Sequence, residues 1–358
     1  MPVHSELSGS AAVSIVDNSV ETTAPSREPA ASVPRGAQSP VEPAAAARGG
    51  LSCPPAAPVH AWMPVSPCEP RCVAGPHAAG PLRTSVRVAG VVGLLAAFPV
   101  INLMTPRSRR SGLHRRCARA LLRCCGIELR IVDRRTTAAA TAPVVRDAVV
   151  DPGMLVVAGH VGWTDVLALA AVSPMGFVAR ADLVSWPLLG RLARSMRVIP
   201  IERERLRQLP EVIAAMSARL AAGERVGVFP EGTTWCGRAH GRLRPALFQA
   251  AVDTATPVQP IRLRYLDRDG EISTIPGFVG VDTFLDSARR VLRSRGVVAE
   301  LVLLPAETPG ADRHDLARRC DQAVRGRTEV HIDAHATAVG TGPTREIVLA
   351  EPESAHSA

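Results

Sequence analysis

The sequence predicts an α/β fold, with a mostly parallel central sheet flanked by helices and preceded by a membrane-associated helical segment. In the second half of the chain, short aliphatic runs alternate with segments of helical periodicity, which is typical of a parallel sheet covered by helices on both faces. Hydrophobic residues make up 46% of the 358 residues, which is enough for a sizeable core. A long apolar stretch and a cluster of arginines lie before this region.

Five short runs rich in β-branched and other aliphatic residues are expected to form buried strands. They span residues 154–158, 175–179, 226–229, 258–263 and 298–304. Residues 197–207 add a short apolar strand that ends in a burst of arginines. Residues 209–223 have helical spacing, and Gly223 is a natural stop for that helix.

The chain divides into four expected regions. Residues 1–80 are rich in Ala, Pro, Ser and Gly without an apolar period, so we expect disorder there. Residues 81–130 are expected to form membrane-associated helices, residues 131–328 the α/β domain and residues 329–358 a flexible tail. Because the first residues lack a basic segment followed by an apolar core, no cleaved signal peptide is expected.

The apolar stretch covers residues 88–106, an uncharged run between Arg87 and Arg107. A spanning helix needs about 20 apolar residues, so this stretch is close to the required length. Pro99 and Asn102 are expected to break its second half. Three alternatives remain open at this point: the stretch spans the bilayer, enters it and returns, or lies at its interface.

Positive charge is concentrated directly after this stretch. The net charge of the chain is +9, and residues 107–135 contain ten arginines against two acids. All 42 basic residues of the chain are arginine, which is typical of a GC-rich bacterial genome. Within the arginine cluster an apolar side chain recurs every four residues, which predicts a helix with one apolar stripe formed by Leu113, Cys117, Leu121 and Cys125.

A basic amphipathic helix beside an apolar segment indicates a membrane-surface element whose arginines contact anionic lipid head groups. The alternatives are a solvated basic helix and a nucleic-acid patch. The absence of interleaved aromatic residues argues against a nucleic-acid partner. The positive charge predicts that the domain that follows lies at the cytoplasmic face of the cell membrane, anchored by residues 88–125.

The eight cysteines are too scattered for a disulfide framework, and free thiols in a reducing compartment are the default expectation. Cys68 and Cys72, in "SPCEPRC", leave open a metal half-site or a disulfide. No second Cys/His pair with ligand spacing follows them, so no metal site is expected.

The stretch "GHVGWTD" places His160 directly after the expected strand 154–158 and Asp165 near the start of the next helix. The carboxyl ends of parallel strands carry ligand sites. A histidine held by a carboxylate keeps one tautomer and presents its other nitrogen as a base. The alternative is a pair of ordinary polar residues at a loop-to-helix junction.

Two further stretches point to the same sheet edge. In "VGVFPEGTTW", a buried strand ends in a turn that brings Glu231 and free backbone N–H groups to that edge. Glu231 is alternatively a structural acid, and Gly232 simply a turn residue. In "RVIPIERERLR", Arg203 is placed to hold an anionic group, the alternative being a solvated helix start.

Together these stretches resemble the glycerolipid acyltransferases of the 1-acylglycerol-3-phosphate acyltransferase family. The first block of that family, Asn-His-x4-Asp, resembles "GHVGWTD", with His160 and Asp165 kept and Gly159 in place of the asparagine. The second block, which ends in arginine, is similar to "RVIPIER", with Arg203 at the arginine position.

The third block, Phe-Pro-Glu-Gly-Thr-Arg, resembles "FPEGTT", in which Thr234 stands in place of the arginine. The fourth, a Val/Ile-x-Pro strand, is similar to Val258 and Pro260. The resemblance covers about residues 85–305 and implies that residues 131–328 form an acyltransferase catalytic domain.

The resemblance implies transfer of a fatty acyl group from acyl-CoA or acyl-carrier protein to a lysolipid hydroxyl, with 1-acylglycerol-3-phosphate as the first candidate acceptor. It implies that His160 is the general base and that Asp165 holds it. Neither an acyl-enzyme nor a cofactor is implied. A lyso-ornithine lipid acceptor and a non-catalytic membrane-binding homologue are the alternatives. A lipid hydrolase is disfavoured because the chain lacks a Gly-x-Ser-x-Gly elbow.

The resemblance also assigns the acceptor site. Arg203 would hold a phosphate or carboxylate, and the turn after the expected strand 226–229 would shape the site through Pro230, Glu231, Gly232 and Thr233. Because Thr234 removes one family anion contact, nearby arginines are candidates to replace it, the alternative being an exposed basic loop: Arg238, Arg242 and Arg244.

Overall fold

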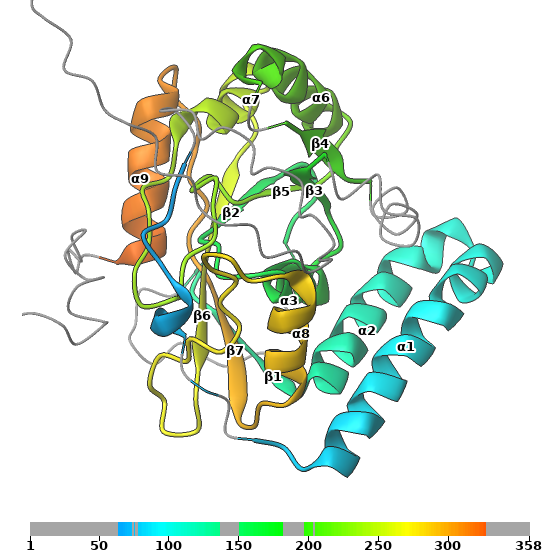
Figure 1. Cartoon of the computed structure of the whole chain (residues 1–358). Coiled ribbons are helices and arrows are strands. Elements are labelled where there is room, and N and C mark those ends of the chain that lie inside the picture. Colours follow the sequence, from blue (N-terminus) through cyan, green and yellow to red (C-terminus); the bar gives the residue numbers. More distant parts are fainter. Residues whose placement is uncertain are drawn as a thin grey trace, which may run out of the picture. The chain divides into compact units, whose positions relative to one another are not determined.

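The computed structural model describes residues 64–73, 75, 78–136, 150–181, 197–202 and 205–326. Within these residues, seven strands form one sheet in the order β1-β7-β6-β2-β5-β3-β4 (Figure 1). The strands are β1 (Ile127–Asp133), β2 (Leu155–Ala158), β3 (Gly176–Arg180), β4 (Ile199–Ile201), β5 (Val226–Val228), β6 (Val258–Leu266) and β7 (Val297–Leu303). The expected disorder before residue 64 and the expected tail at 329–358 lie outside the described residues.

The helices cover both faces of this sheet. They are α1 (Pro81–Met104), α2 (Arg107–Cys125), α3 (Thr164–Val172), α6 (Leu209–Ala221), α7 (Gln249–Asp253), α8 (Phe284–Leu292) and α9 (Arg313–Arg325). Three short 3₁₀ helices span Pro70–Cys72, Leu206–Gln208 and Pro245–Phe248. The predicted fold class, a mostly parallel sheet flanked by helices, is confirmed.

Two hydrophobic clusters form the core, one on each face of the sheet. Successive residues of a strand point to opposite faces, and β2 shows this directly: Val156 belongs to one cluster and Leu155 to the other. The first cluster includes buried residues of α2, α3 and α8. The second includes buried residues of α6, α7 and α9. All four residues of β2 are fully buried, as the uninterrupted apolar run predicts.

The sheet is parallel except where β6 meets β7. Strand β1 pairs in parallel with β7, from Ile127↔Val297 to Asp133↔Leu303. Strands β1 and β7 therefore run opposite to the other five. One edge of the sheet consequently gathers the carboxyl ends of β2, β5 and β6 together with the starts of β1 and β7. The sheet begins at Ile127, inside the segment 81–130 that the sequence assigned to membrane-associated helices.

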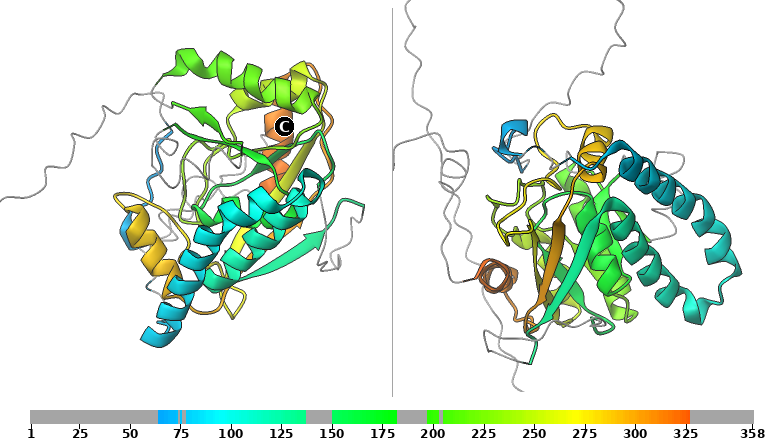
Figure 2. Two further views of the ribbon diagram at one scale, coloured as in Figure 1. Left: turned by 90° about the vertical axis from the view of Figure 1, so that its right-hand side faces the viewer. Right: turned by 90° about the horizontal axis from the view of Figure 1, so that it is seen from below.

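Helices α1 and α2 lie side by side along their lengths (Figure 2). A Cβ on Gly90 of α1 would lie 2.8 Å from Sγ of Cys124, so the two helices approach closely there. Further along, His114 of α2 shares a hydrogen bond of 2.8 Å with Oδ1 of Asn102. The expectation that Pro99 and Asn102 break the helix is wrong. Pro99 lacks only its own N–H donor, and α1 continues to Met104.

Helix α2 contains the expected apolar stripe, and the structure shows what part of it contacts. Leu121 and Cys125 are buried, and α2 packs against α3. Helix α1 lies on α2 and leaves many apolar side chains exposed, including Leu82, Val92 and Leu103. Among the residues described, α1 is the helix that is long and apolar enough to cross a membrane.

The segment 64–73 packs on the domain, although the sequence predicted disorder throughout residues 1–80. Cys68 and Cys72 are buried, form no disulfide and lie in a small cluster with Cys236. The backbone N–H of Cys236 donates to Sγ of Cys68 at 3.3 Å. These contacts give the two cysteines of "SPCEPRC" a packing role. In the part of the chain that the structure describes, no group of three or more His, Cys, Asp or Glu side chains is placed to hold a metal ion.

Candidate active site

His160 and Asp165 form a hydrogen-bonded pair at the carboxyl end of β2. His160 follows β2 by one residue, and Asp165 lies in the first turn of α3. Nδ1 of His160 is 2.8 Å from Oδ2 of Asp165. The Asp165 side chain is fully buried, whereas 15% of the His160 side chain is exposed. The pair therefore couples a buried carboxylate to an imidazole that solvent or a ligand can reach.

Asp165 is held by three further donors. Its Oδ2 accepts the backbone N–H groups of Val161 at 2.6 Å and Gly162 at 2.9 Å. Its Oδ1 accepts the hydroxyl of Tyr265 at 2.8 Å. Because these bonds fix both oxygens, the carboxylate cannot turn away from His160. Gly162 is required here, since a Cβ on it would lie 2.3 Å from the carbonyl oxygen of Pro276.

Tyr265, at the end of β6, is the single tyrosine of the chain. Burial and the negative charge of Asp165 raise the pKa of its hydroxyl well above the ordinary value, which keeps it a donor. Its oxygen is also 2.7 Å from Oγ1 of Thr164. Because Tyr265 donates its one proton to Asp165, the hydroxyl of Thr164 donates to Tyr265.

The imidazole of His160 is also fixed through its face. It stacks on the ring of Phe229 with centroids 4.1 Å apart and an interplanar angle of 10°. Since Nδ1 is occupied by Asp165, the neutral ring carries its proton on Nδ1 and leaves the Nε2 lone pair free. This arrangement suits general-base chemistry at Nε2.

Glu231 joins the loop after β5 to the loop that carries His160. Its Oε2 accepts the backbone N–H of His160 at 2.7 Å, and its Oε1 accepts Nη2 of Arg325. The same Nη2 donates to the carbonyl of Gly241 at 2.9 Å. Burial raises the pKa of the Glu231 carboxyl, and the positive charge of Arg325 opposes that rise. Glu231 thus positions His160 by accepting its backbone N–H and does not contact the ring through this bond.

Backbone contacts tie the remaining residues of the turn to the same place. Gly232 has a φ of 77°, a left-handed conformation that favours glycine. The carbonyl of Pro230 accepts the N–H of Arg244 at 3.0 Å. The N–H of Trp235 donates to the carbonyl of His160 at 2.8 Å. The turn and the His160 loop therefore form one rigid unit.

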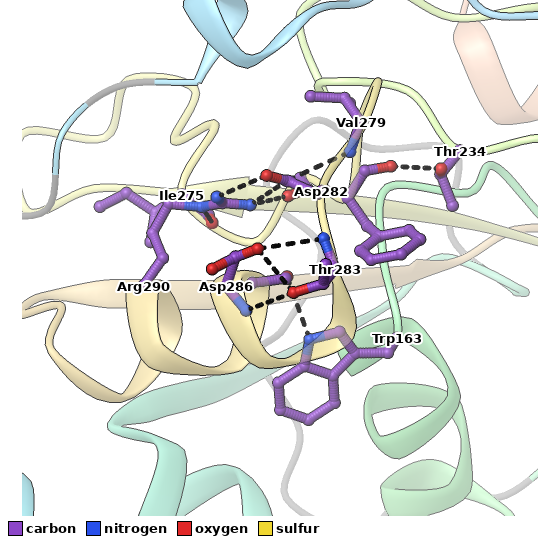
Figure 3. Close-up of polar contacts among 11 residues, drawn as sticks. Trp163, Thr234, Ile275, Val279, Asp282, Thr283, Asp286 and Arg290 are labelled. Atoms are coloured by element: carbon purple, nitrogen blue, oxygen red, sulfur yellow. Dashed lines mark hydrogen bonds and ion pairs between the residues drawn. The ribbon is translucent and has the colours of Figure 1, made fainter. Parts of the chain in front are cut away.

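A second loop, residues 275–283, braces this unit (Figure 3). The N–H of Phe278 donates to the carbonyl of Val161 at 2.9 Å, next to His160. Oγ1 of Thr234 donates to the carbonyl of Phe278, so the residue in place of the family arginine fastens two loops. Arg290 of α8 holds the far side, bonding Asp282 at 2.7 Å and the carbonyl of Ile275 at 3.0 Å.

The structure brings His160, Asp165 and Glu231 together, and Pro230, Gly232 and Thr233 lie in the same turn as Glu231. Arg203 lies outside the described residues. The three arginines proposed as anion contacts are exposed on the loop that follows this turn: Arg238, Arg242 and Arg244.

Two residues of the constellation were not singled out in the sequence, Tyr265 and Arg325. The one available signal for Tyr265 was that it is the sole tyrosine and ends a buried strand. Arg325 gave no signal, because it is one arginine among many near the end of a helix.

Comparison with known proteins identifies the family. A family model described as "Acyltransferase" matches residues 136–264. A lyso-ornithine lipid O-acyltransferase of Pseudomonas aeruginosa is 36% identical over 177 residues, which cover 48% of this chain and 66% of that protein. A 1-acyl-sn-glycerol-3-phosphate acyltransferase of Neisseria gonorrhoeae is 30% identical over 175 residues, which cover 48% of this chain and 68% of that protein.

A lyso-ornithine lipid O-acyltransferase of Rhizobium meliloti is 30% identical over 220 residues, which cover 56% of this chain and 73% of that protein. The crystal structure of the 1-acyl-sn-glycerophosphate acyltransferase from Thermotoga maritima aligns with a TM-score of 0.49 at 15% identity, covering 68% of this chain and 92% of that one. On the sequence matches, this chain belongs to the glycerolipid acyltransferase family, whose members acylate lysolipids.

Proposed function

We propose that this chain transfers a fatty acyl group from acyl-CoA or acyl-carrier protein to a lysolipid hydroxyl, with His160 as the general base. The observation that carries the proposal is the 2.8 Å contact between Nδ1 of His160 and the fully buried Asp165. It leaves Nε2 of His160 as the one ring nitrogen that can accept a proton. The matches to named lysolipid acyltransferases support the same reaction class.

The proposed reaction is a direct transfer. Nε2 of His160 accepts the proton of the acceptor hydroxyl while its oxygen attacks the thioester carbonyl carbon. The carbon–sulfur bond then breaks, and the imidazolium returns the proton to the leaving thiolate. Asp165 stabilises the imidazolium as it forms, because its carboxylate is fixed beside Nδ1. The product is an ester and a free thiol, with no acyl-enzyme between them.

For the acceptor, we propose 1-acylglycerol-3-phosphate, which gives phosphatidic acid. The turn Pro230–Thr233 and Arg203 would border its head group, with Arg238, Arg242 and Arg244 as further anion contacts. A lyso-ornithine lipid is the second candidate. It is favoured by Thr234, which replaces the family arginine and bonds the carbonyl of Phe278. The 36% identical relative is also a lyso-ornithine lipid acyltransferase.

For membrane association, we propose that α1 lies in the bilayer interface at the cytoplasmic face. Its exposed apolar residues, such as Leu82, Val92 and Leu103, supply the contact surface. Because α1 packs along α2, a spanning α1 would draw α2 into the hydrocarbon with it. Each arginine of α2 moved there costs about 2.5–3.5 kcal/mol, which disfavours a span. An interfacial α1 leaves exposed arginines such as Arg109 and Arg116 at the level of the head groups.

Replacement of the proposed base tests the reaction. Purified wild-type chain, His160→Ala and the control His314→Ala are given acyl-CoA with 1-acylglycerol-3-phosphate or a lyso-ornithine lipid. His314 is exposed on α9, so its loss leaves the site intact. Thiol release and lipid mass spectrometry report the product. We expect His160→Ala to lose about 10²- to 10⁴-fold in kcat while the chain stays folded.

Each outcome of this experiment decides something specific. Wild-type turnover by His160→Ala rules out His160 as the base. If the chain acylates the lyso-ornithine lipid and does not acylate 1-acylglycerol-3-phosphate, the lyso-ornithine lipid is the acceptor. If the wild-type chain binds vesicles but releases no thiol with either acyl-CoA or acyl-carrier protein, the chain is a non-catalytic membrane-binding homologue.

A further inference from the structure

A cavity of about 620 Å³ lies away from the catalytic residues, between the start of α1, the end of α2 and the turn that joins β6 towards β7. It shares no lining residue with the constellation around His160. Its lining is dominated by six arginines, which come from five separate stretches of the chain: Arg83, Arg87, Arg123, Arg130, Arg268 and Arg295. We call it the arginine cavity.

Positive charge in the arginine cavity is poorly balanced. Its two acidic lining residues are Glu128 and Asp267. Asp267 is already engaged, because its Oδ1 accepts the N–H groups of Asp269 at 2.9 Å and Glu271 at 3.0 Å. Arg130 pairs with Glu300 at 3.6 Å outside the lining set.

The other exposed arginines of the cavity find no such partner. Arg83, Arg123, Arg268 and Arg295 form no ion pair with a carboxylate among the residues that the structure describes. Several unpaired cations that face one concave site raise the local concentration of anions.

One arginine of the cavity is anchored rigidly. Arg87 is 8% exposed, and its Nη1 donates to the carbonyls of Leu292 at 2.8 Å and Ser294 at 2.7 Å. Gly126 makes room for it, since a Cβ there would lie 1.9 Å from Nη2 of Arg87. A fixed guanidinium presents its N–H groups in a planar fork that matches the oxygens of a phosphate. The cavity therefore combines a preformed donor with exposed cations around it.

The position of the cavity indicates whether the phosphate it binds belongs to a lipid or is a free ion. Arg83 and Arg87 lie in the first turns of α1, directly before its uncharged stretch. Val86, between them, lines the cavity and is 64% exposed. An apolar face next to clustered cations is the pattern that binds anionic lipid at a membrane surface. A free phosphate ion would bind to the cations alone and would make no use of the apolar face.

We propose that the arginine cavity binds the phosphate of an anionic phospholipid head group in the membrane on which α1 rests. This inference depends on the membrane association proposed above, and it is independent of the reaction at His160. The cavity lies where β6 ends and β7 begins, on the sheet edge that also carries His160 after β2. A lipid held there turns the catalytic edge towards the bilayer.

Charge reversal inside and outside the cavity tests this assignment. The cavity variant is Arg268→Glu with Arg295→Glu, both exposed lining residues. The matched control is Arg207→Glu with Arg318→Glu, two exposed arginines that lie outside both α2 and the cavity. Both variants change the net charge equally. Flotation measures binding of the full chain to phosphatidylcholine vesicles with and without phosphatidylglycerol.

We expect phosphatidylglycerol to strengthen binding of the wild-type chain. We expect the increase in vesicle affinity that phosphatidylglycerol causes to be about tenfold or more smaller in the cavity variant. In the control variant we expect it to be about threefold smaller or less. Equal losses in both variants would assign the effect to diffuse surface charge and overturn the proposal. Unchanged binding of the cavity variant would overturn it as well.

A second arm separates lipid from free phosphate. Melting temperatures are measured with inorganic phosphate and with chloride at matched ionic strength. Stabilisation by phosphate that the cavity variant loses, without any dependence of vesicle binding on phosphatidylglycerol, would assign the cavity to free phosphate and overturn the lipid proposal. Thiol release in detergent-dispersed substrate is measured in parallel. Its failure in the wild-type chain contradicts the proposed function and leaves the vesicle result unaffected.

Discussion

Gly159 and Arg325 occupy complementary space beside Glu231. A Cβ on residue 159 would lie 3.0 Å from Nη1 of Arg325 and 3.8 Å from Oε1 of Glu231. The glycine at 159, where the family pattern has asparagine, thus leaves room for a guanidinium that arrives from α9. Arg325 lies beyond residues 136–264, which the family model matches. In this chain helix α9 therefore supports the loop that carries His160.

Gly159→Ala is expected to shift Arg325 slightly against Glu231 and to lower kcat severalfold, because Glu231 then holds the N–H of His160 less firmly. Arg325→Ala is expected to destabilise the chain by about 3 kcal/mol, since it leaves a buried carboxylate unpaired. Kinetics and denaturant unfolding of both single variants and the double variant give the coupling, expected at about 1 kcal/mol or more. Strictly additive effects would mean that the two residues do not act on each other.

Tyr265→Phe removes a donor from Oδ1 of Asp165 and keeps the ring. We expect a loss of about 1–3 kcal/mol in the free energy of unfolding, because a buried carboxylate oxygen and the Thr164 hydroxyl lose their partner. We also expect kcat to fall severalfold with KM unchanged, since Asp165 is then freer to turn away from His160. A lower melting temperature with unaltered kcat would limit Tyr265 to a structural role.

Arg290→Ala is expected to loosen the loop 275–283. It removes bonds to Asp282 and to the carbonyls of Ile275 and Gly277, for a loss of about 2 kcal/mol or more in unfolding free energy. The exposed neighbour Arg289 is the matched control on the same helix. Limited proteolysis of both variants locates the change. Cleavage within the loop in neither variant, or equally in both, would contradict the bracing role.

The buried thiols of Cys125 and Cys320 are expected to resist alkylation in the folded chain. Burial raises the pKa of each to about 12. An ordinary thiol has a pKa of about 8.5, so the thiolate fraction near neutral pH is lower by about a thousandfold or more. Below pH 12 that fraction rises about tenfold per pH unit. Mass spectrometry of iodoacetamide-treated chain, folded and denatured, reports both sites. Rapid labelling of the folded chain at pH 8 would refute the expectation.

The sequence predicted six of the seven strands, and the clearest of them is β2, which is fully buried. Mainly aliphatic runs identify β2, β5, β6 and β7, because strands that are covered on both faces are rich in such residues. Strand β1 was not predicted because "IELRIVD" lies at the edge of the sheet, contains charged residues and buries only Ile127 and Ile131. Its arginines also merged with the cluster on α2.

At the active site, too, the sequence revealed the residues of local motifs and not those that reach the site from distant parts of the chain. His160, Asp165 and Glu231 were found because each lies within a short motif whose chemistry is local. Tyr265 and Arg325 reach the site from residues 100 and 94 positions away from their partners, Asp165 and Glu231. Only the packed sheet brings such residues together, and no spacing rule along the chain encodes that contact. Likewise, the stripe on α2 predicted a helix, and its packing partner α3 became known only from the structure.

The parallel pairing of β1 with β7 has a consequence for biosynthesis. During translation Ile127 leaves the ribosome long before Val297, its partner in the ladder, has been made. Until then β1 presents unsatisfied amide and carbonyl groups, which are prone to intermolecular pairing. Long-range strand closure of this kind also slows folding. If the nascent α1–α2 hairpin docks on lipid early, as the proposed membrane association implies, this edge would be kept apart from neighbouring chains while synthesis is completed.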